Sequence, residues 1–217
     1  MSEWDEHVER EQGRYAAGES RLPDDPDERQ RQLTRLGNAA YGAGLALLMD
    51  GRDDNAREWL SRAAERWRES YAHAPPGSWG RPIGAVKARV LAGDWTGAER
   101  DARWALDSGC AEAESPIGRY AAALAHAVLG DWDDVRTHAD FVRTRDDFPR
   151  PVGDALAFVA AEDVLGYADA VADVLESFEA RDAYLEDVPV ADTVLVLQAI
   201  ADRRGMATDL RSALLPA

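Results

Sequence analysis

The four histidines, His7, His73, His126 and His138, and the single cysteine, Cys110, carry groups that commonly act as metal ligands, bases or nucleophiles. A zinc site needs at least three converging ligands. No His-x-x-x-His or Glu-x-x-His pair occurs in the chain. We therefore expect no metal site, although His126 and His138 fall on the two predicted helices of one hairpin and can approach each other.

Cys110 follows Ser108-Gly109 in a predicted loop, and the carboxylates of Glu112 and Glu114 come shortly after it. A catalytic thiol needs a base and cationic surroundings, whereas nearby carboxylates raise the pKa of a thiol. A single cysteine also cannot form an intramolecular disulfide or a multi-cysteine metal site. Because no Gly-x-Ser-x-Gly motif, phosphate-binding loop or dinucleotide fingerprint occurs either, we predict no catalytic residues and no cofactor.

The charge of the chain bears on its partners. Its 217 residues include 41 Asp and Glu against 25 Lys and Arg, a net charge of −16, and 46% of them are hydrophobic, which is enough for a folded core. An excess of carboxylates disfavours nucleic acid and anionic membrane surfaces. No apolar run is long enough to span a bilayer, and the acidic segment from Met1 to Glu6 lacks the apolar stretch of a secretory signal. We expect a cytoplasmic protein without nucleic-acid or membrane partners.

The cations are almost all arginine, because Lys87 is the only lysine. High acidity with so little lysine resembles proteins from salt-accumulating halophiles, in which high ionic strength screens the repulsion between carboxylates. A GC-rich genome, which favours codons for Arg, Ala, Gly and Asp, is the alternative explanation. The halophile hypothesis predicts that the fold loosens when molar salt is removed.

Four segments begin alike and recur 34 to 38 residues apart, at Pro82-Ile83-Gly84, Pro116-Ile117-Gly118, Pro151-Val152-Gly153 and Pro189-Val190-Ala191. Each continues into an Ala-rich apolar stretch and then reaches a glycine, and an earlier stretch also ends on one; these are Gly51, Gly93, Gly130, Gly166 and Gly205. Proline suits the first turn of a helix and glycine suits the residue that ends one, so each unit is predicted to be a helical hairpin. Abundant alanine without sustained period-two alternation predicts an all-α chain.

Small or apolar residues recur at fixed offsets after the turn glycine. They are Ala56, Ala98, Val135 and Val171 at the fifth position, and Ala63, Ala105, Val142 and Phe178 at the twelfth. An offset of seven keeps one face of a helix, so both positions are predicted to pack on the same side.

These offsets, the period near 34 and the repeated turns Gly93-Asp94-Trp95 and Gly130-Asp131-Trp132 resemble the tetratricopeptide-repeat family in a divergent form, over about residues 36–215. The chain departs from the family at Ala85, Ala122 and Gly44, where larger residues are usual. The resemblance implies a right-handed α-α superhelix, a solenoid of about five helical hairpins, whose first helices line the concave face.

We predict one repeat domain over residues 1–217. Its parts are an N-terminal helix and loop (1–25), a first hairpin (26–77) and successive repeats at 78–115, 116–150, 151–188 and 189–217. Ser115 is the predicted N-cap of the helix that begins at Pro116.

Carboxylates are absent from three windows, 29–49, 70–93 and 115–130, which coincide with predicted first helices. These windows hold seven basic residues: Arg29, Arg31, Arg35, Arg81, Lys87, Arg89 and Arg119. One interpretation is that the first helices are simply buried, with a few basic side chains extending to water. The other is a neutral-to-basic concave groove that favours an acidic or carboxylate-terminated peptide, with candidate binding residues Arg81, Lys87, Arg89, Arg119, Tyr120 and His126.

From these features we expect a non-enzymatic protein-interaction module, a scaffold or adaptor that binds a protein or peptide partner on a curved helical surface. One alternative is a small-molecule binder or enzyme with a pocket between hairpins. Another is an immunity or regulatory protein that neutralises a basic partner with an acidic face. A further alternative is a structural role through self-association into a homo-oligomer.

Overall fold

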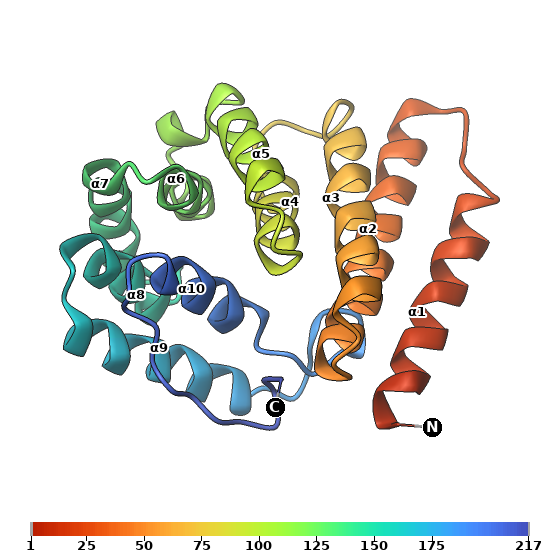
Figure 1. Cartoon of the computed structure of the whole chain (residues 1–217). Helices are drawn as coiled ribbons and strands as arrows, with labels where there is room; N and C mark the ends of the chain where they lie inside the picture. Colours follow the sequence, from red (N-terminus) through yellow and green to blue (C-terminus); the bar gives the residue numbers. More distant parts are fainter. Residues whose placement is uncertain (1, 217) are drawn as a thin grey trace. The chain divides into compact units, whose positions relative to one another are not determined.

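The computed structural model describes residues 2–216, apart from the side chain of Glu3. The described residues form α-helices and two short 3-10 helices without any strand, which confirms the predicted all-α class (Figure 1). In chain order the elements are α1 (Glu3–Glu19), α2 (Pro26–Met49), α3 (Asp53–Tyr71), α4 (Gly80–Leu91), α5 (Trp95–Asp107), η1 (Cys110–Glu112), α6 (Pro116–Leu129), α7 (Trp132–Arg143), α8 (Arg150–Ala161), α9 (Val164–Glu179), η2 (Leu185–Asp187) and α10 (Asp192–Asp202).

The helices group into two compact units. The first holds α1 to α4 together with residues 182–190, which include η2, and residues 212–216. The second holds residues 95–181 and 191–211, which include α5 to α10 and η1. The helices α4 and α5, which lie in the predicted repeat 78–115, therefore belong to different units.

Capping side chains set where several helices begin. The carboxylate of Asp25 accepts a hydrogen bond from the backbone N–H of Glu28 at 2.9 Å, directly before Pro26 opens α2. The hydroxyl of Ser115 accepts from the N–H of Gly118 at 3.3 Å at the start of α6. Such caps satisfy N–H groups that have no partner inside the helix, and the predicted N-cap at Ser115 is confirmed.

Glycines in the left-handed region end the first helices of three hairpins, as predicted. Gly51, Gly93 and Gly130 have φ values of 70°, 67° and 85° and follow α2, α4 and α6. The prediction that Gly166 ends α8 is wrong, because Glu162 makes the left-handed turn with φ 57° and Gly166 lies inside α9. A Cβ atom at Gly166 would lie 2.7 Å from the ring of Phe158, so glycine is needed there for close packing.

The second helices of the hairpins pack with the face predicted from the fixed offsets. The residues at the fifth position after the assigned glycine are fully buried, and those at the twelfth are at most 5% exposed. The repeated small residues therefore mark the packed side of α3, α5, α7 and α9.

In the first unit, α2 lies very close to α3. A Cβ atom at Gly44 would lie 2.7 Å from Cγ of Leu60, and one at Gly37 would lie 2.6 Å from the indole nitrogen of Trp67. Glycine lowers helix propensity, but here it lets the two helices approach closely. The glycines inside α2 are therefore compatible with one continuous helix.

The last predicted repeat, 189–217, contains one helix among the described residues rather than a hairpin. After α10 the chain runs through turns and irregular structure to residue 216. The side chain of Gln198 accepts a hydrogen bond from the N–H of Thr208 at 3.3 Å and donates to the carbonyl oxygen of the same residue. Because these bonds satisfy groups that a helix would use internally, the prediction of a fifth helical hairpin is not confirmed.

Candidate functional site

Three of the predicted groove residues lie in the first unit, on α4. Arg81 donates through Nε to the hydroxyl of Ser70 at 2.8 Å and through Nη2 to the side-chain oxygen of Gln30. Arg89 is 5% exposed and forms ion pairs with Asp94 at 3.2 Å and with Glu65 at 3.6 Å. Lys87 is 9% exposed. The α4 cations are thus largely buried, and Arg81 ties α4 to α2 and α3.

The other three predicted groove residues lie in the second unit, on α6. Arg119 donates through Nε to the carbonyl oxygen of Ala113 at 2.7 Å, and its guanidinium lies 5.1 Å from the ring centroid of Phe141. Tyr120 is 6% exposed and packs against Phe148 with ring centroids 5.2 Å apart. Burial, and then the charge of Asp192, raise the pKa of the Tyr120 hydroxyl.

His126 completes the predicted set and meets His138, as their places on one hairpin suggest. The two rings stack with centroids 5.5 Å apart and an interplanar angle of 13°. Nδ1 of His126 lies 3.3 Å from a carboxylate oxygen of Asp131. Burial, then the neighbouring His126 and Arg119, lower the pKa of His138. The pair is a charge-sensitive contact between α6 and α7.

The six predicted residues therefore fall into two groups of three, one in each unit, and no structural finding joins them into one groove. Lys87, Arg89 and Tyr120 are buried, and Arg81, Arg119 and His126 are partly exposed with contacts inside the protein. This agrees with the simpler interpretation of the carboxylate-free windows, in which first helices are poor in acids because they pack inside the protein. The continuous concave groove stays a prediction.

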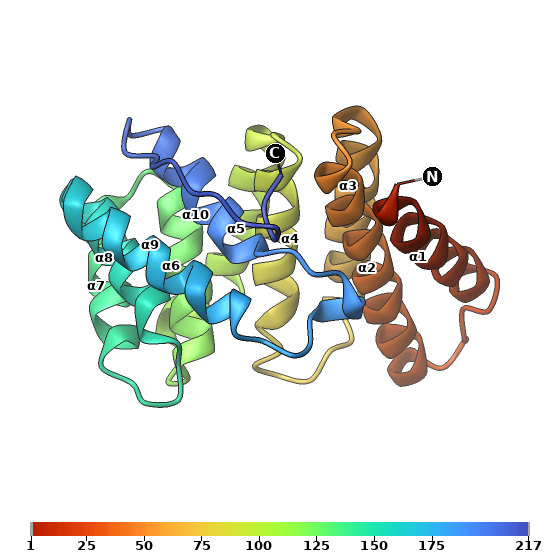
Figure 2. The ribbon, with the colours of Figure 1, turned by 90° about the horizontal axis from the view of Figure 1, so that it is seen from below.

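Segments from the C-terminal part of the chain lie on first helices of their own unit. In the first unit, η2 packs on α2, where a Cβ atom at Gly42 would lie 3.4 Å from Val188, and Arg10 of α1 donates to the carbonyl oxygen of Glu186 at 2.8 Å. In the second unit, α10 packs on α8 and α9 (Figures 1 and 2). Where these contacts form, the first helices are covered by the chain itself.

The end of α10 is fixed to the ends of two first helices. Arg203 donates to the carbonyl oxygen of Val128 in α6 at 3.4 Å, and Arg204 donates to that of Val159 in α8 at 2.8 Å. Both arginines also lie over tryptophans of the repeated Gly-Asp-Trp turns, Arg203 at 4.3 Å from the Trp95 ring centroid and Arg204 at 4.0 Å from that of Trp132. The turn tryptophans thus hold the last helix of the second unit.

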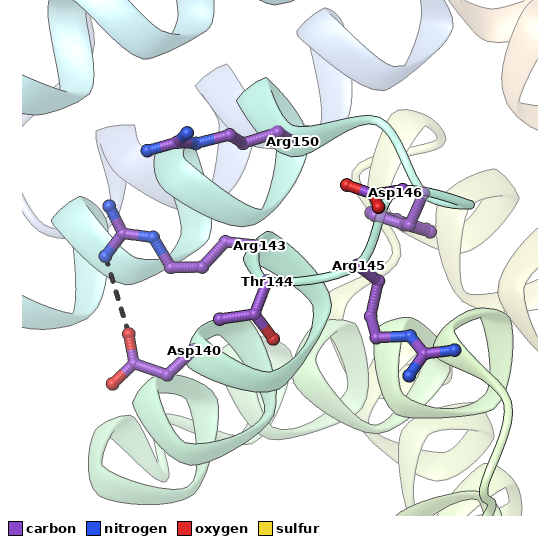
Figure 3. A pocket seen from close by; sticks show the side chains of 7 residues that line it. Asp140, Arg143, Thr144, Arg145, Asp146 and Arg150 are labelled. Atoms are coloured by element: carbon purple, nitrogen blue, oxygen red, sulfur yellow. Dashed lines mark hydrogen bonds and ion pairs between the residues drawn. The ribbon is translucent and has the colours of Figure 1, made fainter.

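A surface hollow of about 650 Å³ opens at the connection between α7 and α8. We call it the arginine hollow; it is lined by Asp140, Arg143, Thr144, Arg145, Asp146, Phe148 and Arg150 (Figure 3). In Figure 3 the side chains of Arg143 and Arg150 extend to one side of the hollow and that of Arg145 to another. Our sequence predictions did not include this site, although three arginines within eight residues of so acidic a chain were a signal that could have found it.

The arginines of the hollow have carboxylate partners that differ in exposure, because the side chain of Asp147 is 62% exposed and that of Asp154 only 18%. Arg143 and Arg150 approach Asp154 at 2.6 and 3.3 Å, and Arg145 approaches Asp147 at 3.3 Å. Arg145 and Asp147 are both well exposed, so water screens that ion pair, whereas Arg143 and the exposed Arg150 share the largely buried Asp154. Phe148 links the floor of the hollow to Tyr120 on α6.

Cys110 is fully buried, and burial raises the pKa of its thiol to about 11, with a smaller contribution from Glu112. A neutral, enclosed thiol is a poor nucleophile, which agrees with the expectation from the neighbouring carboxylates. Over residues 2–216, as described, no group of three or more His, Cys, Asp or Glu side chains is placed to hold a metal ion. In the same part of the chain, no helix is both long and apolar enough to cross a bilayer.

No protein-family model, curated protein or solved structure matches the chain.

Proposed function

We propose that this protein is a non-enzymatic protein-interaction module that binds an acidic segment of a protein or peptide partner. The observation that carries the proposal is the arginine hollow, an open depression with three guanidinium groups and a phenyl ring on a chain whose net charge is −16. Guanidinium groups recognise carboxylates through paired, charge-assisted hydrogen bonds. The hollow therefore suits a partner with acidic side chains and an apolar residue.

The ion pair of Arg145 with Asp147 does not prevent an acidic partner from binding Arg145. Exposed pairs such as Arg145 with Asp147 contribute about 0.2–1 kcal/mol each, because both groups are well solvated when apart. A partner carboxylate can therefore replace Asp147 at little cost, whereas Arg143 and Arg150 keep Asp154 and can offer their remaining N–H donors to further carboxylates of the partner. Phe148 gives the partner an apolar contact at the same place.

The test is selection of ligands from a displayed peptide library by the full-length protein, followed by measurement of the selected peptides by calorimetry. We expect acidic peptides that contain an aromatic or aliphatic residue. The double variant Arg145→Glu/Arg150→Glu should lower their affinity by about tenfold or more, as expected for the loss of charge-assisted hydrogen bonds.

The matched control is Arg57→Glu/Arg103→Glu, which makes the same change in net charge at arginines that are 62% and 61% exposed on α3 and α5. This control should keep most of the affinity. Equal losses in both double variants would show a general effect of charge, and selection of no acidic peptide would refute the proposal.

A further inference from the structure

The first turn of α9 carries two exposed apolar side chains. Val164 and Leu165 are 52% and 79% exposed, and Leu165 has the highest exposed fraction among the large hydrophobic residues that the structure describes. The carboxylate of Asp163 caps this end of the helix by accepting a hydrogen bond from the N–H of Gly166 at 2.9 Å. The turn is therefore well formed, and most of the Leu165 side chain faces water in the single molecule.

A row of carboxylates continues from Leu165 along α9. Asp169, Asp173 and Glu176 follow it at spacings of four, four and three residues, which places all four side chains on one face of the helix. The three carboxylates are exposed, and among the described residues no cation pairs with them. We call these four residues the α9 ridge, in which an apolar side chain is followed by acids on successive turns.

The α9 ridge has the chemistry that the arginine hollow is proposed to bind. The hollow offers three guanidinium groups beside the partly exposed ring of Phe148 (Figure 3). Guanidinium groups pair with carboxylates, and an aliphatic side chain such as Leu165 loses contact with water when it packs on a phenyl ring. The two surfaces are thus complementary both in charge and in apolar character.

We propose that the partner of the arginine hollow is a second copy of this chain, which docks its α9 ridge there. Leu165 of one molecule packs on Phe148 of the next, and the carboxylates of Asp169 and Asp173 bind the arginines of the hollow. This inference rests on the proposed function, because it names the acidic partner of the same site.

The contact has to join two molecules. Arg150 lies at the start of α8 and lines the hollow, whereas Leu165 lies just beyond the other end of α8. A helix of 12 residues is about 18 Å long, so Leu165 does not reach the hollow of its own chain.

The charges favour a contact between the two different surfaces over a symmetric one. Two ridges that faced each other would bring carboxylates together, and two hollows would bring arginines together. A contact of ridge with hollow is heterologous, so each added molecule keeps one free ridge or hollow at each end of the assembly. Association can therefore continue beyond a dimer as the protein concentration rises.

The first test is sedimentation equilibrium of the full-length wild-type protein over a concentration series. It uses the lowest KCl concentration at which the helical circular dichroism signal is complete, because salt screens contacts between exposed charges. We expect the average mass to rise above that of the monomer as the concentration increases. A protein that stays monomeric up to about 1 mM would overturn the inference.

The second test removes the charges of the hollow. Arg145→Glu/Arg150→Glu should raise the dissociation constant of self-association by about tenfold or more. The control Arg57→Glu/Arg103→Glu makes the same change in net charge outside both surfaces and should keep most of the affinity. Self-association that persists unchanged in Arg145→Glu/Arg150→Glu, or is lost equally in the control, would overturn the role of the hollow.

The third test changes the ridge. Asp169→Asn/Asp173→Asn should weaken self-association by about tenfold, and so should Leu165→Gln, which keeps the net charge. The control Asp54→Asn/Asp209→Asn removes two carboxylates that are 97% and 80% exposed outside the ridge and should keep most of the affinity. Unchanged self-association in both ridge variants would overturn the inference.

A mixture of variants separates the head-to-tail contact from a symmetric one. Arg145→Glu/Arg150→Glu keeps its ridge, and Asp169→Asn/Asp173→Asn keeps its hollow. An equimolar mixture of the two should therefore form a one-to-one complex with about the wild-type affinity, although each variant alone associates weakly. A mixture that associates no more strongly than its components would overturn the contact of ridge with hollow.

Failure of this inference can be told from failure of the proposed function. Selection of acidic peptides that need Arg145 and Arg150, together with a wild-type protein that stays monomeric, would overturn only the second copy as the partner. Absence of both peptide binding and self-association would refute both proposals.

Discussion

At the scale of single residues, the same side-chain type takes different roles according to its long-range partners. Arg81 is held inside the first unit by Ser70 and Gln30, whereas Arg203 remains exposed over Trp95. Nothing in the sequence next to either arginine distinguishes them, because the partners come from other helices. For that reason the sequence identified basic residues in the first helices but could not tell buried cations from accessible ones.

The glycines of α1 and α2 provide a matched pair of substitutions. Gly37→Ala should lower the free energy of unfolding by about 1–3 kcal/mol, because its Cβ atom would lie 2.6 Å from the indole of Trp67. Gly13→Ala meets nothing within 4 Å in α1 and should raise the free energy of unfolding by about 0.5–1 kcal/mol through helix propensity. Urea unfolding of both variants checks the prediction, and stabilisation by Gly37→Ala would contradict the close packing of α2 on α3.

The lowered pKa of His138 predicts a pH dependence of stability. Its pKa in the folded protein is below its ordinary value of 6.5, because burial, His126 and Arg119 disfavour the charged form more than Asp134 and Glu112 favour it. The unfolded chain therefore binds the proton first as the pH falls. The contribution of His138 to the free energy of unfolding is complete above pH 6.5 and is lost progressively below it.

The measurement is urea unfolding at about pH 7.5 and about pH 5.5 for the wild type and His138→Gln. The difference between the two pH values should be smaller in the variant. The exposed His73 provides the control, because His73→Gln should leave the pH dependence as it is in the wild type. An equal pH dependence in wild type and His138→Gln would contradict the prediction.

At the scale of elements, helix boundaries follow from local chemistry and could be predicted. Pro26 after Asp25 and Pro116 after Ser115 both begin helices, and Gly51, Gly93 and Gly130 follow the helices that they were predicted to end. Each of these helix boundaries depends on a few neighbouring residues. The elements of the candidate sites were therefore predictable even where their residue roles were not.

The errors occur where a distant contact decides the local structure. Glu162 makes the turn after α8 in a left-handed conformation that favours glycine, and its side chain pairs with Arg204, which follows α10. In the irregular chain after α10, the side chain of Gln198 binds the backbone of Thr208. Neither interaction is visible in the repeat pattern, which is why the turn after α8 was assigned wrongly to Gly166; the hairpin predicted for the last repeat is not confirmed.

The short helix η1 makes Cys110 a reporter for opening of the second unit. η1 packs against α5 and α6, and its thiol is fully buried with a pKa of about 11. Ellman's reagent should therefore label the native protein at least about a hundredfold more slowly than the urea-unfolded protein. Cys110→Ala, which removes the only thiol, gives the background rate. Labelling of the native protein at nearly the unfolded rate would show that η1 is not held against α6.

At the scale of the whole molecule, the chain has a net charge of −16, and the second helices differ in how far arginines compensate their carboxylates. α3, α5 and α7 each carry an arginine paired with a carboxylate one turn away, as in Arg62 with Glu58 and Arg103 with Glu99. α9 contains no basic residue, although its exposed side includes Asp169, Asp173 and Glu176. Carboxylate repulsion along α9 therefore lacks local compensation, and dissolved cations must screen it.

This arrangement predicts that the free energy of unfolding rises with salt. Between about 0.1 M and about 2 M KCl the screening length falls from about 10 Å to below 3 Å, so repulsion between carboxylates on successive turns of α9 is strongly reduced.

Asp169→Arg places a cation one turn before Asp173 and should lower the dependence of the free energy of unfolding on KCl. Glu58→Arg makes the same change in net charge on α3 but breaks the pair with Arg62, so it should lower that dependence less. Urea unfolding across the KCl series measures all three proteins. A wild-type free energy of unfolding that does not change with KCl would contradict both the role of α9 and the halophile hypothesis, and equal effects of the two substitutions would show that net charge matters rather than its place.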